Sequence, residues 1–310
     1  MTRGQLRGPG WQWLTHGLYA PVGASDALLE RARAVSQVLP RNSGFGHLTS
    51  AALRGWWLPN RLGPHVLLAT TTSRVHVQRP GLYVRRSDLA EFENVGSDNG
   101  IRCVTGAQTL LELAKDLTLV DLVPIVDCAL AGGTSAADIE AVSRRPNRRG
   151  AATLRRALLL ADDRSESWWE SVLRLQHVLT GLGPVECQVE IRDKPTQGRF
   201  VARADLHLVG TRRYPECDGG EHRSRERHVK DLRREKAMSR LGLERYGYST
   251  AEITNQPQLV ISDAESARGL APDPRRVQTW WRTARPSTLT AGGRRRLAVR
   301  LARYRRAAPD

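Results

Sequence analysis

The sequence predicts an α/β protein of the α+β type, in which two mixed domains precede a charged tail. Segments with the two-residue alternation of strands and the 3.6-residue periodicity of helices occur in both halves of the 310-residue chain. The pattern changes at about residue 162, and proline, arginine and glycine dominate after residue 266. We therefore expect a mixed domain over residues 1–162, a second domain over 163–266, and a partly helical, weakly packed tail over 267–310.

In the first domain, strand-like and helical segments are interleaved. Residues 11–20 alternate apolar and polar side chains around a glycine, as a strand or short hairpin does. Residues 25–40 begin with a serine cap and carry an acid in the first turn, which predicts a helix. Further helices are expected at 49–58, 107–117, 119–130, 135–145 and 151–162, and strands at 65–71, 81–87 and 101–105.

In the second domain, a helix is followed by strands. Residues 165–183 have helical periodicity, and 185–191 read as a strand that ends in a polar turn. Two further strands, 200–209 and 212–219, are separated by a tight turn near Gly210. A charged helix at 223–241 and a strand at 243–248 complete the order. We expect one mixed sheet that carries the hairpin of residues 200–218, with both helices packed against it.

The formal charge of the chain is +16, and its distribution points to a polyanionic partner. Residues 274–309 contain eleven arginines and no acid, whereas the rest of the chain is only mildly basic. Nucleic acid is the partner that this charge favours. The consecutive residues Arg294, Arg295 and Arg296 are candidate DNA contacts.

Other features of the composition favour a cytoplasmic protein. No apolar run is long enough to cross a bilayer, which predicts no membrane association. The N-terminal residues lack the apolar stretch of a secretion signal. The four cysteines are scattered and form no C-x-x-C pair, so neither a zinc ribbon nor a disulfide framework is expected.

Residues 214–222, YPECDGGEH, concentrate side chains that can bind a metal ion. Glu216 and Asp218 are two residues apart on a strand and therefore share a face. Asp205 lies on the preceding strand and shares that face if the turn has an even number of residues. An odd turn would place Asp205 on the other face. Cys217 is expected to point into the domain core, opposite the acids.

Three converging carboxylates repel one another unless a cation joins them. Their hard oxygen atoms suit Mg²⁺ or Mn²⁺, which can generate a nucleophile and stabilise charge on a phosphate. An acidic strand end followed by glycines is also typical of a solvated hairpin exit. Spacing alone likewise allows His222 to be an ordinary surface residue and Glu170 to lie on a solvated helix face.

The order of these segments over residues 165–254 resembles the Vsr-like endonuclease domain, a branch of the PD-(D/E)xK superfamily. That family has a helix with a glutamate, a strand ending in an aspartate, a Glu-x-Asp-Gly strand with a histidine beyond it, and an Asp-x-x-Arg helix. The resemblance implies a restriction-endonuclease-like fold. The matching residues here are Glu170, Asp205, Glu216, Asp218, His222, Asp231 and Arg234.

Two residues depart from the family pattern. Pro215 occupies a position that is usually β-branched, and proline removes a ladder donor, which predicts an edge or the start of a strand. The superfamily lysine is replaced by Asp218, and His222 or Lys230 would then have to take its place. The resemblance therefore implies the fold more strongly than it implies activity.

The first half resembles the actinobacterial form of AbiEi-type antitoxin proteins, on the segments RGPGWQWLTHGLYAP, LTSAALRGWWLP and VTGAQTLLELA. This resemblance implies a winged-helix start that is truncated, because the wing-like segment begins almost at Met1. It also implies a toxin or another defence-system protein as partner.

Three functions follow as hypotheses. The first is a Mg²⁺- or Mn²⁺-dependent DNA endonuclease or nicking enzyme. In it, Asp205, Glu216 and Asp218 hold the metal, Glu170 supports them, His222 transfers protons, and Lys230 and Arg234 contact DNA. The second is a non-catalytic, antitoxin-like DNA-binding regulator with a relic nuclease fold. The third is a structural or partner-binding protein with solvated acids.

Overall fold

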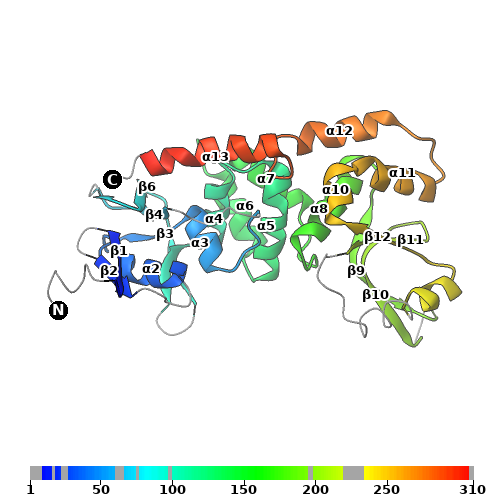
Figure 1. Cartoon of the computed structure of the whole chain (residues 1–310), viewed down its shortest axis with the longest axis horizontal. Coiled ribbons are helices and arrows are strands. Elements are labelled where there is room, and N and C mark those ends of the chain that lie inside the picture. Colours follow the sequence, from blue (N-terminus) through cyan, green and yellow to red (C-terminus); the bar gives the residue numbers. More distant parts are fainter. Residues whose placement is uncertain are drawn as a thin grey trace. The chain divides into compact units, whose positions relative to one another are not determined.

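The computed structural model describes residues 9–15, 18–21, 27–59, 66–74, 77–96, 100–194, 198–218 and 234–306. The chain forms two compact units, each built from separate stretches of sequence. Unit 1 comprises residues 1–125, 132–159 and 295–310, and unit 2 comprises residues 126–131 and 160–294. Figure 1 labels their elements in sequence order.

Unit 1 contains a mixed six-stranded sheet with strand order β5-β6-β4-β3-β8-β7. At its centre β3 pairs antiparallel with β4 and parallel with β8, while β4 pairs parallel with β6. A separate antiparallel ladder joins β1 and β2, within the segment predicted as a hairpin. The strands are β1 (Trp11–Thr15), β2 (Leu18–Pro21), β3 (Ser43–Phe45), β4 (Leu67–Thr71), β5 (Gln78–Arg79), β6 (Leu82–Arg86), β7 (Phe92–Val95) and β8 (Ile101–Val104).

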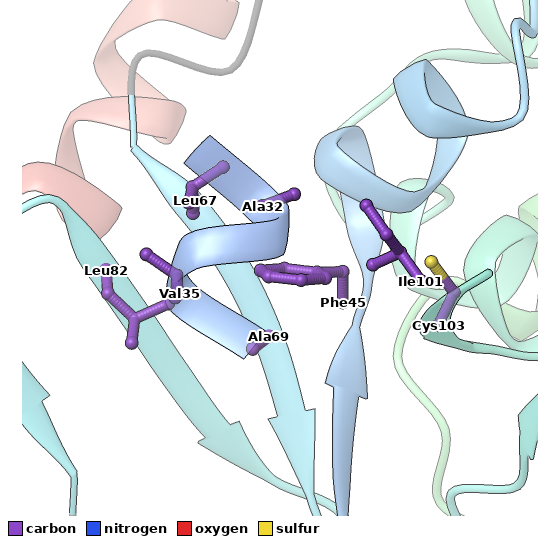
Figure 2. Packing of buried hydrophobic residues seen from close by; sticks show 8 residues of the cluster. All are labelled: Ala32, Val35, Phe45, Leu67, Ala69, Leu82, Ile101 and Cys103. Carbon is purple, nitrogen blue, oxygen red and sulfur yellow. The ribbon is translucent and has the colours of Figure 1, made fainter. Parts of the chain in front are cut away.

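Helix α2 packs on the centre of this sheet. Phe45 is fully buried among Ala32 and Val35 of the helix and Leu67 and Ala69 of β4, as Figure 2 shows. The helices that lie wholly or partly in unit 1, α2 included, follow the helical segments of the sequence. They are α2 (Ala27–Ser36), α3 (His47–Leu53), α4 (Gly106–Leu113), α5 (Leu119–Ala131), α6 (Ala136–Arg144), α7 (Ala151–Leu160) and α13 (Ala291–Arg306).

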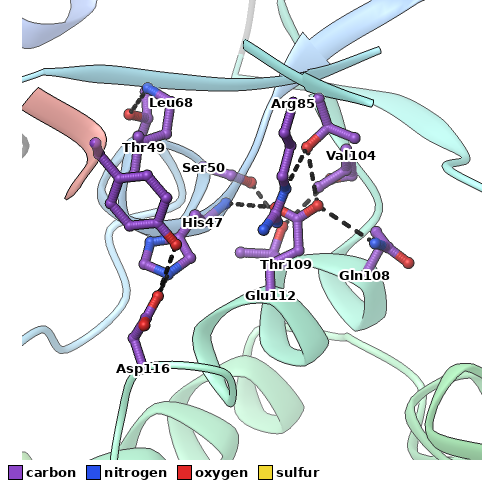
Figure 3. Close-up of polar contacts among 12 residues, drawn as sticks. His47, Thr49, Ser50, Leu68, Arg85, Val104, Gln108, Thr109, Glu112 and Asp116 are labelled. Atoms are coloured by element: carbon purple, nitrogen blue, oxygen red, sulfur yellow. Dashed lines mark hydrogen bonds and ion pairs between the residues drawn. The ribbon is translucent and has the colours of Figure 1, made fainter. Parts of the chain in front are cut away.

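A buried polar network joins the start of α3 to α4 (Figure 3). Glu112 of α4 is fully buried and forms an ion pair with Arg85, and it accepts hydrogen bonds from the His47 backbone N–H and the Thr70 hydroxyl. Burial opposes ionisation of Glu112, but the neighbouring cations and hydrogen bonds lower its pKa. The network fixes the close approach of the two helices.

The C-terminal helix α13 is part of the same network. Asp116, which is 1% exposed, is within 2.9 Å of the His47 Nε2 atom and accepts a 2.7 Å hydrogen bond from the Tyr304 hydroxyl. Arg303 adds an ion pair of 2.7 Å to the same carboxylate. A buried carboxylate with this many donors is well compensated, so α13 is held by specific contacts.

Unit 2 contains two ladders of two strands each, together with several helices. Strand β10 pairs antiparallel with β9, and β11 pairs parallel with β12. The buried ion pair between Arg174 and Asp127 (2.6 Å) connects α8 to residues 126–131. Residues 234–240 are also helical. The elements are α8 (Trp168–Leu179), β9 (Val185–Arg192), β10 (Phe200–Leu208), β11 (Arg213–Asp218), β12 (Glu244–Ser249), α10 (Thr250–Asn255), α11 (Pro257–Ala267) and α12 (Pro274–Ala284).

Two expectations for the second half need correction. Strands β10 and β11 are sequence neighbours, but they do not form a common hydrogen-bonded ladder; within the described residues each pairs with a different strand. The segment 267–310 is not a weakly packed tail, because Trp280, Leu297 and Tyr304 are all buried. Apolar residues at helical spacing among the arginines provide this packing, and the segment is divided between the two units.

None of the helices in the described part of the chain combines the length and the apolar character needed to cross a bilayer.

Candidate functional site

The predicted acidic residues of unit 2 come from α8, β10 and β11. The Ser167 side chain caps α8 by accepting the Glu170 N–H at 3.2 Å, which places Glu170 in the first helical turn. On β10 the even-numbered residues from Ala202 to Leu208 are buried, so Asp205 lies on the opposite face of the strand.

Asp205 reaches across to β11. Its Oδ2 atom accepts a hydrogen bond from the Cys217 backbone N–H at 3.2 Å. The connection between the strands, residues 209–212, has an even length, and Gly210 in it has a positive φ of 81°. This is the parity for which Asp205 shares a face with Glu216 and Asp218.

Glu216 is held by two arginines. It is 3% exposed, and its two carboxylate oxygens pair separately with Arg234 and with the Nε atom of Arg245, the latter at 2.5 Å. Arg234 also donates to the backbone carbonyl of Arg203. Burial raises the pKa of Glu216, and the two guanidinium groups act against that rise.

Asp218 lies at the end of β11, beside β12. Its Oδ1 atom is 3.4 Å from the Nη2 atom of Arg245. A Cβ atom at Gly247 would lie 2.3 Å from the Asp218 Oδ2 atom, so the carboxylate occupies space that any other residue at 247 would fill.

The three predicted metal ligands do not converge on one point. Among the residues that the structure describes, no group of three or more His, Cys, Asp or Glu side chains is arranged to hold a metal ion. The reason is that Glu216 and Asp218 face Arg245, whereas Asp205 bonds to the Cys217 backbone.

Glu170 is a second buried acid beside Asp205. It is 8% exposed and accepts hydrogen bonds of 2.9 Å from the Glu166 backbone N–H and from the Gln188 side chain. Burial raises the pKa of Glu170, and the negative charge of Asp205 raises it further. Burial likewise raises the pKa of Asp205.

Gln188 supports Glu170 from an unusual backbone conformation. Its φ of +54° is in the left-handed region, which a residue with a side chain rarely adopts. The register of β9 with β10 is the same on both sides of Gln188, because Cys187 pairs with Leu206 and Val189 with Ala204. Backbone strain of this kind is often found at functional sites.

The side chain of Cys217 is half-buried. Burial raises its pKa to about 12, and the charges of Asp205, Glu170 and Asp218 contribute to the rise. The thiol is therefore protonated at neutral pH and is no nucleophile.

The site has an excess of negative charge. Within the described residues, Glu166 pairs with Arg203, and Glu216 and Asp218 share Arg234 and Arg245. Glu170 and Asp205 form no ion pair with any described residue. Glu170, which is buried, and Asp205, which is half-buried, are thus two carboxylates without an ion-pair partner among the described residues, and a divalent cation could balance their charge.

Some predicted residues are elsewhere or are not described. His222, Lys230 and Asp231 lie outside the described residues. Arg294, Arg295 and Arg296 are exposed on α13.

The sequence did not indicate Gln188, Arg245 or Gly247 as members of the site. The i, i+2 spacing places Arg245 and Gly247 on one face of β12. The parallel register of this strand with β11, in which Glu216 pairs with Gly247, has no local sequence signal.

Comparisons of this chain with protein-family models, with curated proteins and with solved structures found no match.

Proposed function

We propose that unit 2 is a restriction-endonuclease-like domain that hydrolyses phosphodiester bonds in DNA with Mg²⁺ or Mn²⁺. The observation that carries this proposal is the pair of carboxylates Glu170, which is buried, and Asp205, which is half-buried, because neither forms an ion pair with a described residue. The ordered Vsr-like sequence pattern over residues 165–254 supports it.

The donor set fits a hard divalent cation. Mg²⁺ is commonly bound through one or two carboxylates, with water and substrate phosphate completing the octahedron. Glu170 and Asp205 supply carboxylate oxygens, and burial makes their charges costly unless a cation balances them. When bound, the ion would supply an activated water molecule and offset negative charge on the phosphate.

The other residues of the site orient these groups. Gln188 and the Glu166 backbone fix one oxygen of Glu170, and the Cys217 backbone fixes one oxygen of Asp205. Glu216 holds Arg234 and Arg245, whose positive charge attracts a phosphate. His222 remains the predicted proton carrier.

The test is nicking of supercoiled plasmid in Mg²⁺, Mn²⁺ or EDTA. Asp205→Asn and Glu170→Gln should each reduce the metal-dependent rate by at least about a hundredfold, because each removes a charge that holds the ion. Glu190→Gln is the matched control, since that carboxylate is exposed and pairs with Arg192 on the same strand.

A second readout does not depend on knowing the substrate. Binding of Mn²⁺ to the folded state must raise the free energy of unfolding, by about 2.7 kcal/mol at a hundred times Kd. The wild type and Glu190→Gln should gain this stability, and Asp205→Asn should not. Equal gains in all three proteins would contradict a metal site at Asp205.

One observation favours a second function, an antitoxin-like DNA-binding regulator with a toxin or defence-system protein as partner. Both oxygens of Glu216 are engaged by arginines, so this family carboxylate is satisfied without a metal ion. A regulator would bind DNA without cleaving it under any metal condition, and Mn²⁺ would not change its stability.

A further inference from the structure

Helix α12 presents a basic surface that has an aromatic side chain at its centre. Trp280 and Ala284 of this helix are buried, at 1% and 0% exposure, so they fix which face packs inside unit 2. The outward residues Gln278, Trp281, Arg282 and Arg285 follow the i, i+3, i+4, i+7 spacing of a single helix face.

A hollow of about 520 Å³ lies against this face. Its described lining residues are Arg275, Val277, Gln278, Trp281, Arg282 and Arg285. The volume is in the range of sites that hold a drug-sized molecule such as a nucleotide. No acid occurs among these residues, so the described lining is cationic around an indole.

Two cations of the hollow, Arg275 and Arg282, are available to a ligand. Arg275 and Arg282 are exposed and form no ion pair within the described part of the chain, although Arg282 donates a 2.9 Å hydrogen bond to Thr279. By contrast, the neighbouring Arg276 pairs with Glu265 at 2.7 Å and helps to anchor the helix. Arg275 and Arg282 are thus not needed for the packing of α12.

We propose that this hollow binds unpaired nucleotides of a nucleic acid strand, with a base stacked on Trp281 and phosphates at the arginines. Arg275 and Arg282 are seven residues apart, about 10 Å along the helix axis, so the charges follow a backbone and do not surround one phosphate. A base in a duplex is already stacked, whereas an unpaired base offers its face to an indole.

This inference rests on the proposed function and deepens it, because it names the form of nucleic acid that unit 2 binds. Binding is measurable in EDTA without any cleavage. In EDTA, Asp205→Asn should therefore bind the single strand as the wild type does. Absence of nicking by the wild type would contradict the proposed nuclease, whereas absence of single-strand binding would contradict the proposal for the hollow, so the two failures can be distinguished.

The experiment is fluorescence anisotropy of a labelled twelve-nucleotide oligo-dT, with the matching duplex and oligo-U as further probes. Trp281→Ala should weaken binding of the single strand roughly tenfold or more, and Trp281→Phe should retain most of it. Replacing Arg275, Arg282 and Arg285 by Gln should lower the log–log salt slope by about 2, at about 0.7 per phosphate on a single strand.

Arg144→Gln is the matched control, because it removes an exposed arginine of unit 1 and should leave binding of the probe almost unchanged. Tighter binding of oligo-U than of oligo-dT supports the proposal and assigns RNA. If Trp281→Ala destabilises the fold, the variant in which Arg275, Arg282 and Arg285 are replaced by Gln tests the proposal through its salt slope. Three results would overturn the proposal. The first is that duplex and single strand bind equally and Trp281→Ala weakens neither. The second is that the arginine variant leaves the salt slope unchanged, and the third is that poly-glutamate displaces the protein from the probe as well as unlabelled oligo-dT does.

Discussion

The buried ionisable side chains divide into those that are compensated and those that are not. Glu112 and Asp116 in unit 1 are ionised because arginines and hydrogen-bond donors surround them. Glu170 and the half-buried Asp205 in unit 2 accept hydrogen bonds but form no ion pair with a described residue. The more deeply buried pair therefore has lowered pKa values, whereas the pKa values of Glu170 and Asp205 are raised.

His177 in α8 gives a prediction about pH. It is 2% exposed, and burial lowers its pKa from 6.5 to about 4. The unfolded chain takes up this proton below about pH 6.5 and the folded chain does not, so stability is complete above that pH and falls as pH decreases. Between pH 7 and pH 4 this residue should remove roughly 3 kcal/mol from the free energy of unfolding.

Urea unfolding of the wild type and of His177→Gln at pH 7 and pH 4.5 measures this effect. The variant should lose clearly less stability on acidification, because the amide does not titrate. The other buried groups titrate in both proteins, so they cancel in the difference. An equal loss in the two proteins would show that His177 is protonated in the fold.

At the residue scale, alternation along a strand left the face of Asp205 open, because it depended on the length of the turn, and in the structure Asp205 faces away from the buried residues of β10. It could not predict what Asp205 meets, since the Cys217 N–H comes from a strand that is not in the same ladder. The arginines that occupy Glu216 come from residues 18 and 29 positions later in the chain. Partner choice at such distances depends on the fold.

At the scale of elements, periodicity predicted most helices and strands close to their observed limits. It did not predict pairing, because β11 finds β12 in a parallel ladder and not its sequence neighbour β10. It also missed α12 and α13 as packed helices, since their arginines conceal the apolar positions Trp280 and Leu297. Composition describes a whole segment, whereas burial depends on a few residues at helical spacing.

The end of α13 gives a prediction at this scale. The Tyr304 hydroxyl donates to Asp116 and accepts a 2.8 Å hydrogen bond from Arg303, and it is 6% exposed as a residue. Tyr304→Phe removes a hydrogen bond to a buried carboxylate and should lower the free energy of unfolding by about 1.5–3 kcal/mol.

Tyr83→Phe is the control for that variant. The Tyr83 ring contacts the Tyr304 ring at a centroid distance of 4.9 Å, but no hydrogen bond of its hydroxyl occurs within the described residues. Its loss should cost less than about 0.5 kcal/mol. Thermal unfolding of both variants measures the difference, and equal values would mean that the rings, not the hydroxyl, hold α13.

At the scale of the whole molecule, the chain passes between its two units more than once. Residues 126–131 belong to unit 2 although unit 1 surrounds them in sequence, and residues 295–310 return to unit 1. The sequence predicted a single boundary between the two domains, near residue 162. Local sequence patterns do not show that a later segment packs back on an earlier domain. The positive charge of the C-terminal segment is consequently part of two folded units.

This organisation predicts where a truncation acts. Removing residues 295–310 should destabilise unit 1, because Asp116 loses Arg303 and Tyr304 and the buried Leu297 is deleted. A buried carboxylate that loses these two donors, and keeps only its contact with His47, costs about 1–3 kcal/mol, to which the lost apolar burial adds. Unit 2 ends at residue 294 and should keep its stability.

Hydrogen exchange followed by mass spectrometry should therefore show faster exchange at α3 and α4, with β9 and β10 unchanged. Faster exchange in β9 and β10, or no change in α3 and α4, would show that residues 295–310 are not part of the folded structure of unit 1.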